Sequence, residues 1–144
     1  MTNDESADEV GLPTPDPAWA AHFKDPLYRE ISDDRTPFGS DEGADMLDEW
    51  AGMRDELGPE STVSQILEGD GSGFTIEDAI ADPDDSDAQG YVKSAGFVLL
   101  YLTGHIDKAG RDATLKALDN QIRIYGADDP VLARQRQDLQ SWTE

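Results

Sequence analysis

Residues 87–103 read DAQGYVKSAGFVLLYLT, and this stretch decides the fold. Its second half, from Phe97 to Leu102, is apolar on every side of a helix, and Lys93 is the single basic residue of the stretch. A helix that is apolar all round must be enclosed by other elements, because no face of it meets water favourably. The stretch therefore predicts a central helix.

The ends and the interior of this helix carry further signals. Ser86 and Gln89 form an S-x-x-Q capping box in front of it, and Gly104 follows it as a stop. Gly90 and Gly96 lower its helix propensity, so we expect a neighbouring backbone to pass close to both.

Amphipathic segments on both sides predict the helices that surround it. They repeat apolar residues at three- and four-residue spacing and are bounded by capping residues, glycine or proline. They comprise a short turn within 18–31 interrupted by Pro26, then 41–57 behind an N-cap at Ser40, 61–68, 75–81, 107–125 and a last helix from Pro130. No segment alternates apolar and polar residues for long enough to predict a strand.

The chain of 144 residues thus predicts one all-α domain, a compact bundle of about five or six helices over residues 18–144. Residues 1–17 contain acidic residues, three prolines and no basic residue, and are expected to form a mobile acidic arm. The core is expected to include Trp50, Phe97, Leu99, Leu102, Leu118, Ile122 and Leu139, with Leu115 and Tyr125 also facing inward.

The net charge of −21 lies entirely in the first 90 residues. Residues 1–90 hold 25 acidic and 4 basic residues, whereas residues 91–144 hold 7 of each. Nucleic acids and anionic membrane surfaces bind basic footprints, so neither is an expected partner. A basic protein is the partner that such a charge distribution favours.

Composition also limits the compartment. The absence of cysteine excludes disulfides and thiolate metal sites, and the N-terminal residues show no secretory signal. The longest apolar run, residues 97–102, is far shorter than the ~20 residues that a membrane-spanning helix needs. We expect a cytoplasmic protein.

Carboxylates gather along the predicted helix 41–57. Arg54 is the only basic residue there, so these side chains are expected to form a binding surface for a basic partner: Asp41, Glu42, Asp45, Asp48, Asp55 and Glu56. Asp55 and Glu56 would lie at the C-terminal end of the helix dipole, where negative charge is unfavourable. Retention of such charges favours a docking role.

Catalytic, metal and cofactor signals are missing from the sequence. His22 and His105 belong to no zinc-binding pattern, and the loop 68–77, although it resembles part of an EF-hand, has Ala79 where a bidentate glutamate would be required. We therefore assign no catalytic residue, no metal ligand and no cofactor.

Two other functions remain open. One is an enzyme or metal-dependent hydrolase that uses carboxylates near Asp41 and Asp45 together with His22 or His105. The other is a plain helical domain whose acidic surface is adapted to high salt and has no dedicated site. A cleft that brings a histidine and carboxylates together would favour the enzyme.

The segment 36–47, TPFGSDEGADML, has the most distinctive sequence in the chain. With Trp50, the preceding DPLY at 25–28 and the later LTGHID at 102–107, it resembles the YfeS-like family of small bacterial proteins. Similar segments occur in proteins named as regulators of molybdate metabolism. The resemblance implies no activity and no site residue.

Overall fold

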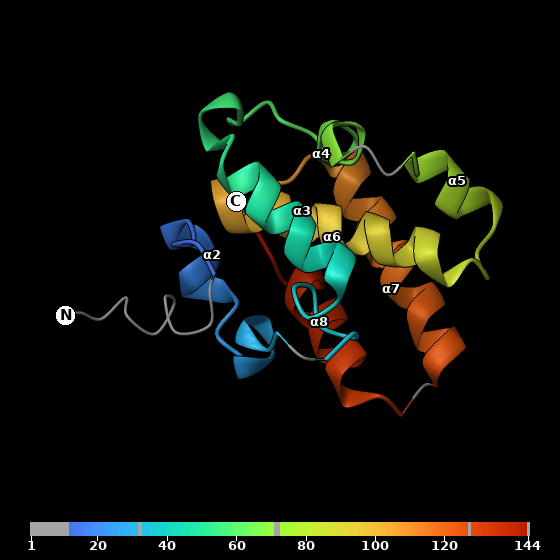
Figure 1. Ribbon diagram of the computed structural model, residues 1–144. Helices are drawn as coiled ribbons and strands as arrows, with labels where there is room; N and C mark the ends of the chain where they lie inside the picture. The colour runs from blue at the N-terminus through green and yellow to red at the C-terminus, as the bar shows by residue number, and fades with distance from the viewer. Residues whose placement is uncertain (1–11, 32, 71–72, 127, 144) are drawn as a thin grey trace.

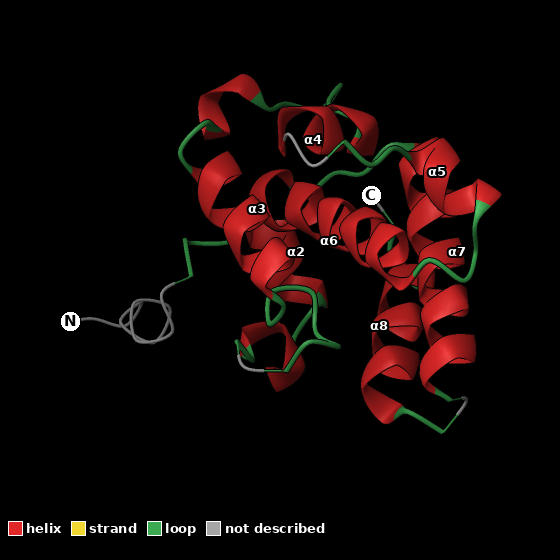
Figure 2. Ribbon diagram, turned by 45° about the vertical axis from the view of Figure 1, so that its right-hand side comes forward, coloured by secondary structure: helices red, strands yellow, loops and turns green. Residues whose placement is uncertain are grey.

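The computed structural model describes residues 12–31, 33–70, 73–126 and 128–143, which form helices and loops without a strand (Figure 2). The all-α prediction is confirmed. The described elements are α2 (Pro17–His22), the 3₁₀ turn η1 (Pro26–Arg29), α3 (Asp41–Ala51), the 3₁₀ turn η2 (Arg54–Glu56), α4 (Val63–Asp70), α5 (Ile76–Ala81), α6 (Ser86–Thr103), α7 (Lys108–Tyr125) and α8 (Pro130–Gln140). None of the described helices is long and apolar enough to cross a membrane.

Helix α6 is the central helix that the sequence predicts. It contacts α2, α3, α4, α5 and α7, and α8 packs on α7 (Figure 1). Every residue from 92 to 102 is buried, Lys93 included. Of the expected core residues, Ile122 is partly buried and the other six are buried.

The start of α6 differs from the prediction. Asp85 is the N-cap and accepts from the backbone N–H groups of Asp87 and Ala88, so Ser86 is the first helical residue. The side chain of Gln89 does not complete a capping box, because it donates to the carbonyls of Ala79 and Asp82 at 3.0 and 3.1 Å. The predicted stop is confirmed: Gly104 has a left-handed φ of 69°.

The two glycines of α6 have different environments. A Cβ at Gly96 would lie 2.1 Å from Oγ1 of Thr114, so the absence of a side chain lets α7 approach α6. A Cβ at Gly90 would meet nothing closer than 3.8 Å. The expected close approach is therefore correct for Gly96 and wrong for Gly90.

Several aspartates begin helices by accepting hydrogen bonds from backbone N–H groups that have no partner within the helix. The aspartate caps are Asp16, Asp25, Asp85, Asp107 and Asp129. Asp107 serves two helices, since its Oδ2 accepts from Gly110 of α7 and its Oδ1 from Val63 of α4. A share of the acidity is thus structural.

Residues 12–16 pack on the end of α6. Leu12 is buried, and the backbone N–H of Asp16 donates to the carbonyl of Tyr101 at 2.8 Å. Arg54 donates to the carbonyls of Thr14 and Leu102. Of the arm expected over residues 1–17, residues 1–11 lie outside the described residues, whereas residues 12–16 pack against the core.

Candidate binding site on the acidic face

Helix α3 separates its buried face from its acidic face. Ser40 accepts from the backbone N–H of Gly43 at 3.1 Å and fixes the start of the helix. The side packed against the core carries Gly43, Met46, Leu47 and Trp50, while Asp41, Asp45 and Asp48 are exposed and Glu42 is half-buried.

The predicted extension of this helix to residue 57 is wrong. Helix α3 ends at Ala51, and Asp55 and Glu56 lie in the separate 3₁₀ turn η2, both exposed. Gly52 caps α3 and Met53, with φ −115° and ψ 25°, leaves the helical conformation. The helix dipole of α3 therefore acts unfavourably on Asp48, in the last turn, and not on Asp55 or Glu56.

The six predicted surface residues, Asp41, Glu42, Asp45, Asp48, Asp55 and Glu56, are called the acidic strip below. No side chain of the acidic strip forms a hydrogen bond or an ion pair with another described residue. Arg54, the basic residue of segment 41–57, donates to backbone carbonyls and not to these carboxylates. The strip therefore forms no ion pair within the described part of the chain.

A pocket of about 210 Å³ lies at the N-terminal end of α3. Two residues of the acidic strip, Asp41 and Glu42, line it, and Asp34 and Asp87 add carboxylates from the loop before α3 and from the first turn of α6. Those two side chains, like the strip, have no hydrogen-bond or ion-pair partner among the described residues. Lys93, Gln121 and Tyr125 line the same pocket.

Lys93 is the buried cation of this region, with 2% of its surface exposed. Burial lowers the pKa of Lys93 from 10.5 to about 7, against the opposing influence of Asp33, Glu42, Asp129 and Asp34. Its Nζ donates to the backbone carbonyl of Arg35 at 2.8 Å.

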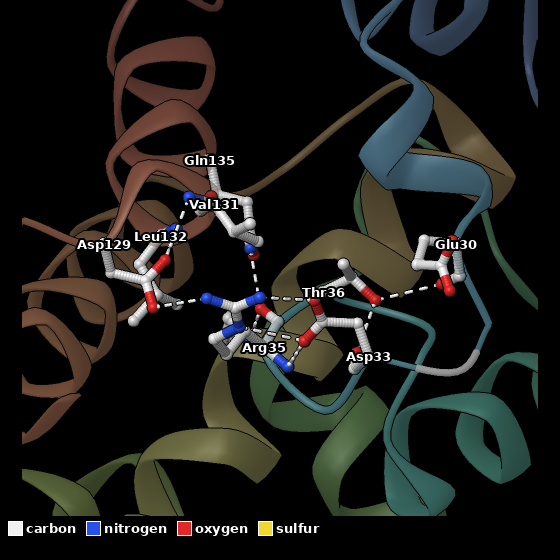
Figure 3. A network of polar contacts seen from close by, with 9 residues as sticks. Glu30, Asp33, Arg35, Thr36, Asp129, Val131, Leu132 and Gln135 are labelled. Atoms are coloured by element: carbon white, nitrogen blue, oxygen red, sulfur yellow. Dashed lines mark hydrogen bonds and ion pairs between the residues drawn. The ribbon is translucent and has the colours of Figure 1, made fainter.

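A polar network holds that carbonyl in place (Figure 3). The guanidinium of Arg35 binds Asp33 at 2.7 Å and Asp129 at 2.8 Å, and Gln135 donates to the Arg35 carbonyl at 2.7 Å. These bonds lower the pKa of Asp33, and the Arg35 and backbone hydrogen bonds lower the pKa of Asp129 although burial opposes them. The network joins the loop before α3 to the start of α8.

Two pocket residues on α7 were not predicted as site residues. Gln121 has 5% of its surface exposed, and its buried Oε1 has no hydrogen-bond partner. Tyr125, expected to face inward, is 52% exposed. The sequence feature that bears on the exposure of Tyr125 is Gly126, which ends α7 directly after it and so places Tyr125 at the end of the helix.

The histidines do not join this pocket. Nε2 of His22 lies 2.7 Å from the carbonyl oxygen of Asp138 and 3.1 Å from Oγ of Ser141. The backbone N–H of His105 donates to Thr103 Oγ1. Neither ring lines the pocket beside Asp41, so the described residues do not assemble the carboxylate–histidine site that the enzyme hypothesis requires.

A metal centre is not formed by the described residues either, since no three histidine, aspartate or glutamate side chains among them are placed to hold an ion. Within the EF-hand-like loop, residues 71–72 lie outside the described residues.

Comparison with known proteins agrees with the resemblance drawn from segment 36–47. Over 42 residues the chain is 52% identical to the uncharacterised protein YfeS of Escherichia coli (strain K12). The match covers 28% of this chain and 17% of YfeS. No family model and no solved structure matches the chain. The resemblance to the YfeS-like family is thus confirmed over this short stretch.

Proposed function

We propose that this protein is an interaction module that binds a basic protein through the acidic strip on α3 and η2. The observation that carries the proposal is that all six carboxylates of the strip lack a partner among the described residues. Carboxylates exposed close together make the electrostatic potential at that surface more negative, and this potential steers positively charged partners toward the surface.

Acidity elsewhere in the chain supports this interpretation by contrast. Asp107 and Asp129 cap helices, and Asp129 also pairs with Arg35. Asp138 accepts from Tyr28 at 2.7 Å and pairs with Arg134. These carboxylates have a structural use. Those of the acidic strip form no hydrogen bond or ion pair among the described residues, and only Asp41 and Glu42 lie in the first turn of α3, where the helix dipole favours negative charge.

Affinity capture from a native lysate tests the proposal with three baits. The first is the wild-type protein, and the second carries Asp48→Lys and Asp55→Lys. The third carries Glu60→Lys and Asp82→Lys, two exposed carboxylates outside the strip, and changes the net charge equally. A basic protein recovered by the first and third baits but lost with the second supports the proposal.

Equal recovery of basic proteins by the second and third baits would contradict it. That result would favour the plain helical domain with a salt-adapted surface, because attraction would then follow net charge and not the acidic strip.

A further inference from the structure

We propose that the pocket at the N-terminal end of α3 receives one arginine side chain of the basic partner. This inference rests on the proposed function and names the anchor within the docking surface. The pocket opens beside the acidic strip and shares Asp41 and Glu42 with it.

The arrangement of the acceptors favours a guanidinium. Asp34, Asp41, Glu42 and Asp87 line the pocket, yet the described residues provide no group of three carboxylates close enough to hold a metal ion. Separated acceptors fit a planar cation with five donors better than a compact point charge. Such a cation would bridge carboxylates that the described residues do not gather in threes around a metal ion.

Gln121 is a second and independent observation. Its side chain is buried in the pocket wall, and its Oε1 lacks the donor that a buried amide oxygen requires. The amide Nε2 of Gln121 and Oε2 of Glu42 lie 3.8 and 3.9 Å from the point where a Cβ of Gly90 would stand. The two polar groups thus lie over the same open glycine. A guanidinium placed there donates to Oε2 of Glu42, whereas Nε2 of Gln121 is itself a donor and offers it no hydrogen bond.

Tyr125 supplies the wall that a guanidinium stacks on. Its side chain lines the pocket and is half exposed, although it ends an otherwise well-packed helix. The face of an aromatic ring attracts a cation placed within about 6 Å of its centre through the ring quadrupole.

The net charge of the pocket depends on whether Lys93 is protonated. Its pKa of about 7 means that a second cation entering the pocket displaces a proton from Lys93. The charged groups that face Lys93 are Asp33, Asp34, Glu42 and Asp129. Binding is therefore expected to release a proton near pH 7 and to strengthen as the pH rises from 6 to 8.

The test uses N-acetyl-arginine amide and its uncharged isostere N-acetyl-citrulline amide as probes, titrated into the full chain by calorimetry. We expect saturable one-to-one binding of the arginine probe and at least tenfold weaker binding of citrulline. Equal affinities for the two probes, or no saturable binding of the arginine probe, would overturn the inference.

Variants locate the site. Gly90→Leu fills the space between Glu42 and Gln121 without altering any charge, and should reduce affinity for the arginine probe at least tenfold. Gly90→Ala, whose Cβ makes only ordinary contacts, controls for the helix backbone. Glu42→Gln should weaken binding similarly, whereas Glu49→Gln, an exposed α3 carboxylate outside the pocket, should not. Unchanged affinity in Gly90→Leu would place the probe elsewhere and overturn the inference.

The two proposals fail separately. If Gly90→Leu binds the captured basic protein as well as wild type does, the anchor is wrong while the docking surface stands. If Asp48→Lys with Asp55→Lys leaves that protein's binding unchanged while Gly90→Leu abolishes arginine binding, the docking surface is wrong and the pocket stands.

Discussion

The ammonium of Lys93, on the central helix, donates a 2.8 Å hydrogen bond to the backbone carbonyl of Arg35, 58 residues earlier. The same carbonyl accepts from Gln135 of α8, so it keeps a donor if Lys93 is replaced. A buried lysine whose hydrogen-bond partner has a substitute donor is an opportunity to measure the cost of burying one charge.

Lys93→Met should stabilise the fold in a pH-dependent way. The pKa of Lys93 is about 7 in the folded chain and 10.5 as the reference, so the unfolded chain binds a proton that the folded chain lacks between these values. Wild-type stability due to this group therefore rises with pH from about 7 to 10.5. The advantage of Lys93→Met should be largest at pH 7 and below, on the order of 4 kcal/mol, and should shrink toward pH 10.

Denaturant unfolding of both proteins at pH 6, 7, 8 and 9 measures this difference. The exposed Lys116 offers a matched control, and Lys116→Met should change stability little at any of these pH values. An advantage of Lys93→Met that stays constant with pH would contradict the buried-charge account.

The two glycines of α6 should respond to alanine with opposite signs. Gly96→Ala places a Cβ 2.1 Å from Oγ1 of the fully buried Thr114, and overpacking of this kind typically costs about 1–3 kcal/mol. Gly90→Ala meets no close atom and should gain up to about 1 kcal/mol from helix propensity. Thermal unfolding measures the stability of the two variants relative to wild type. Equal destabilisation by both substitutions would contradict the environments assigned to the two glycines.

Asp107→Ala should destabilise two helices at once. One carboxylate accepts from Val63 at 2.9 Å and from Gly110 at 3.0 Å, and the loss of each cap is worth about 1 kcal/mol. We expect a total loss of about 2 kcal/mol in urea unfolding. Asp112→Ala, which removes an exposed ion pair with Lys108, should stay within about half a kcal/mol. Equal small losses would show that Asp107 caps neither helix.

Leu102→Ala tests the position of α6 in the core. Leu102 is 3% exposed near the end of the helix, and truncation of a buried leucine costs about 2–5 kcal/mol. A loss below about half a kcal/mol in equilibrium unfolding is typical of surface sites and would contradict the central placement.

Sequence predicts the features that depend on neighbouring residues. Asp129 followed by Pro130 marks the start of α8, Thr75 and Asp78 form the reciprocal capping box of α5, and Gly104 ends α6. The burial of α6 is also predictable, because the apolar run that causes it lies within the residues of this one helix.

Predictions fail where a distant group competes for a side chain. Gln89 suits a capping box, but the carbonyls of Ala79 and Asp82 lie within its reach and Asp85 takes over the cap. The sequence predicts one continuous helix over 41–57. The side chain of Arg54 instead donates to the carbonyls of Leu102 and Thr14, and the chain leaves the helical conformation at Met53.

The pocket shows the same limit. Asp41 and Glu42 are visible as part of an acidic helix, whereas Asp34, Lys93 and Gln121 come from a loop and two other helices. Their meeting depends on how α3, α6 and α7 pack, and no short-range pattern in the chain encodes it.

The association rate constant with the captured basic protein tests the docking surface most directly, compared between wild type and the Asp48→Lys, Asp55→Lys variant. Exposed charges steer encounter, and their effect is screened beyond about 10 Å at 0.1 M salt. The wild-type rate should fall steeply from low to physiological ionic strength, and the variant should associate at least tenfold more slowly at low salt. The Glu60→Lys, Asp82→Lys control should retain most of the wild-type rate. Equal rates for wild type and the strip variant at low salt would contradict the account.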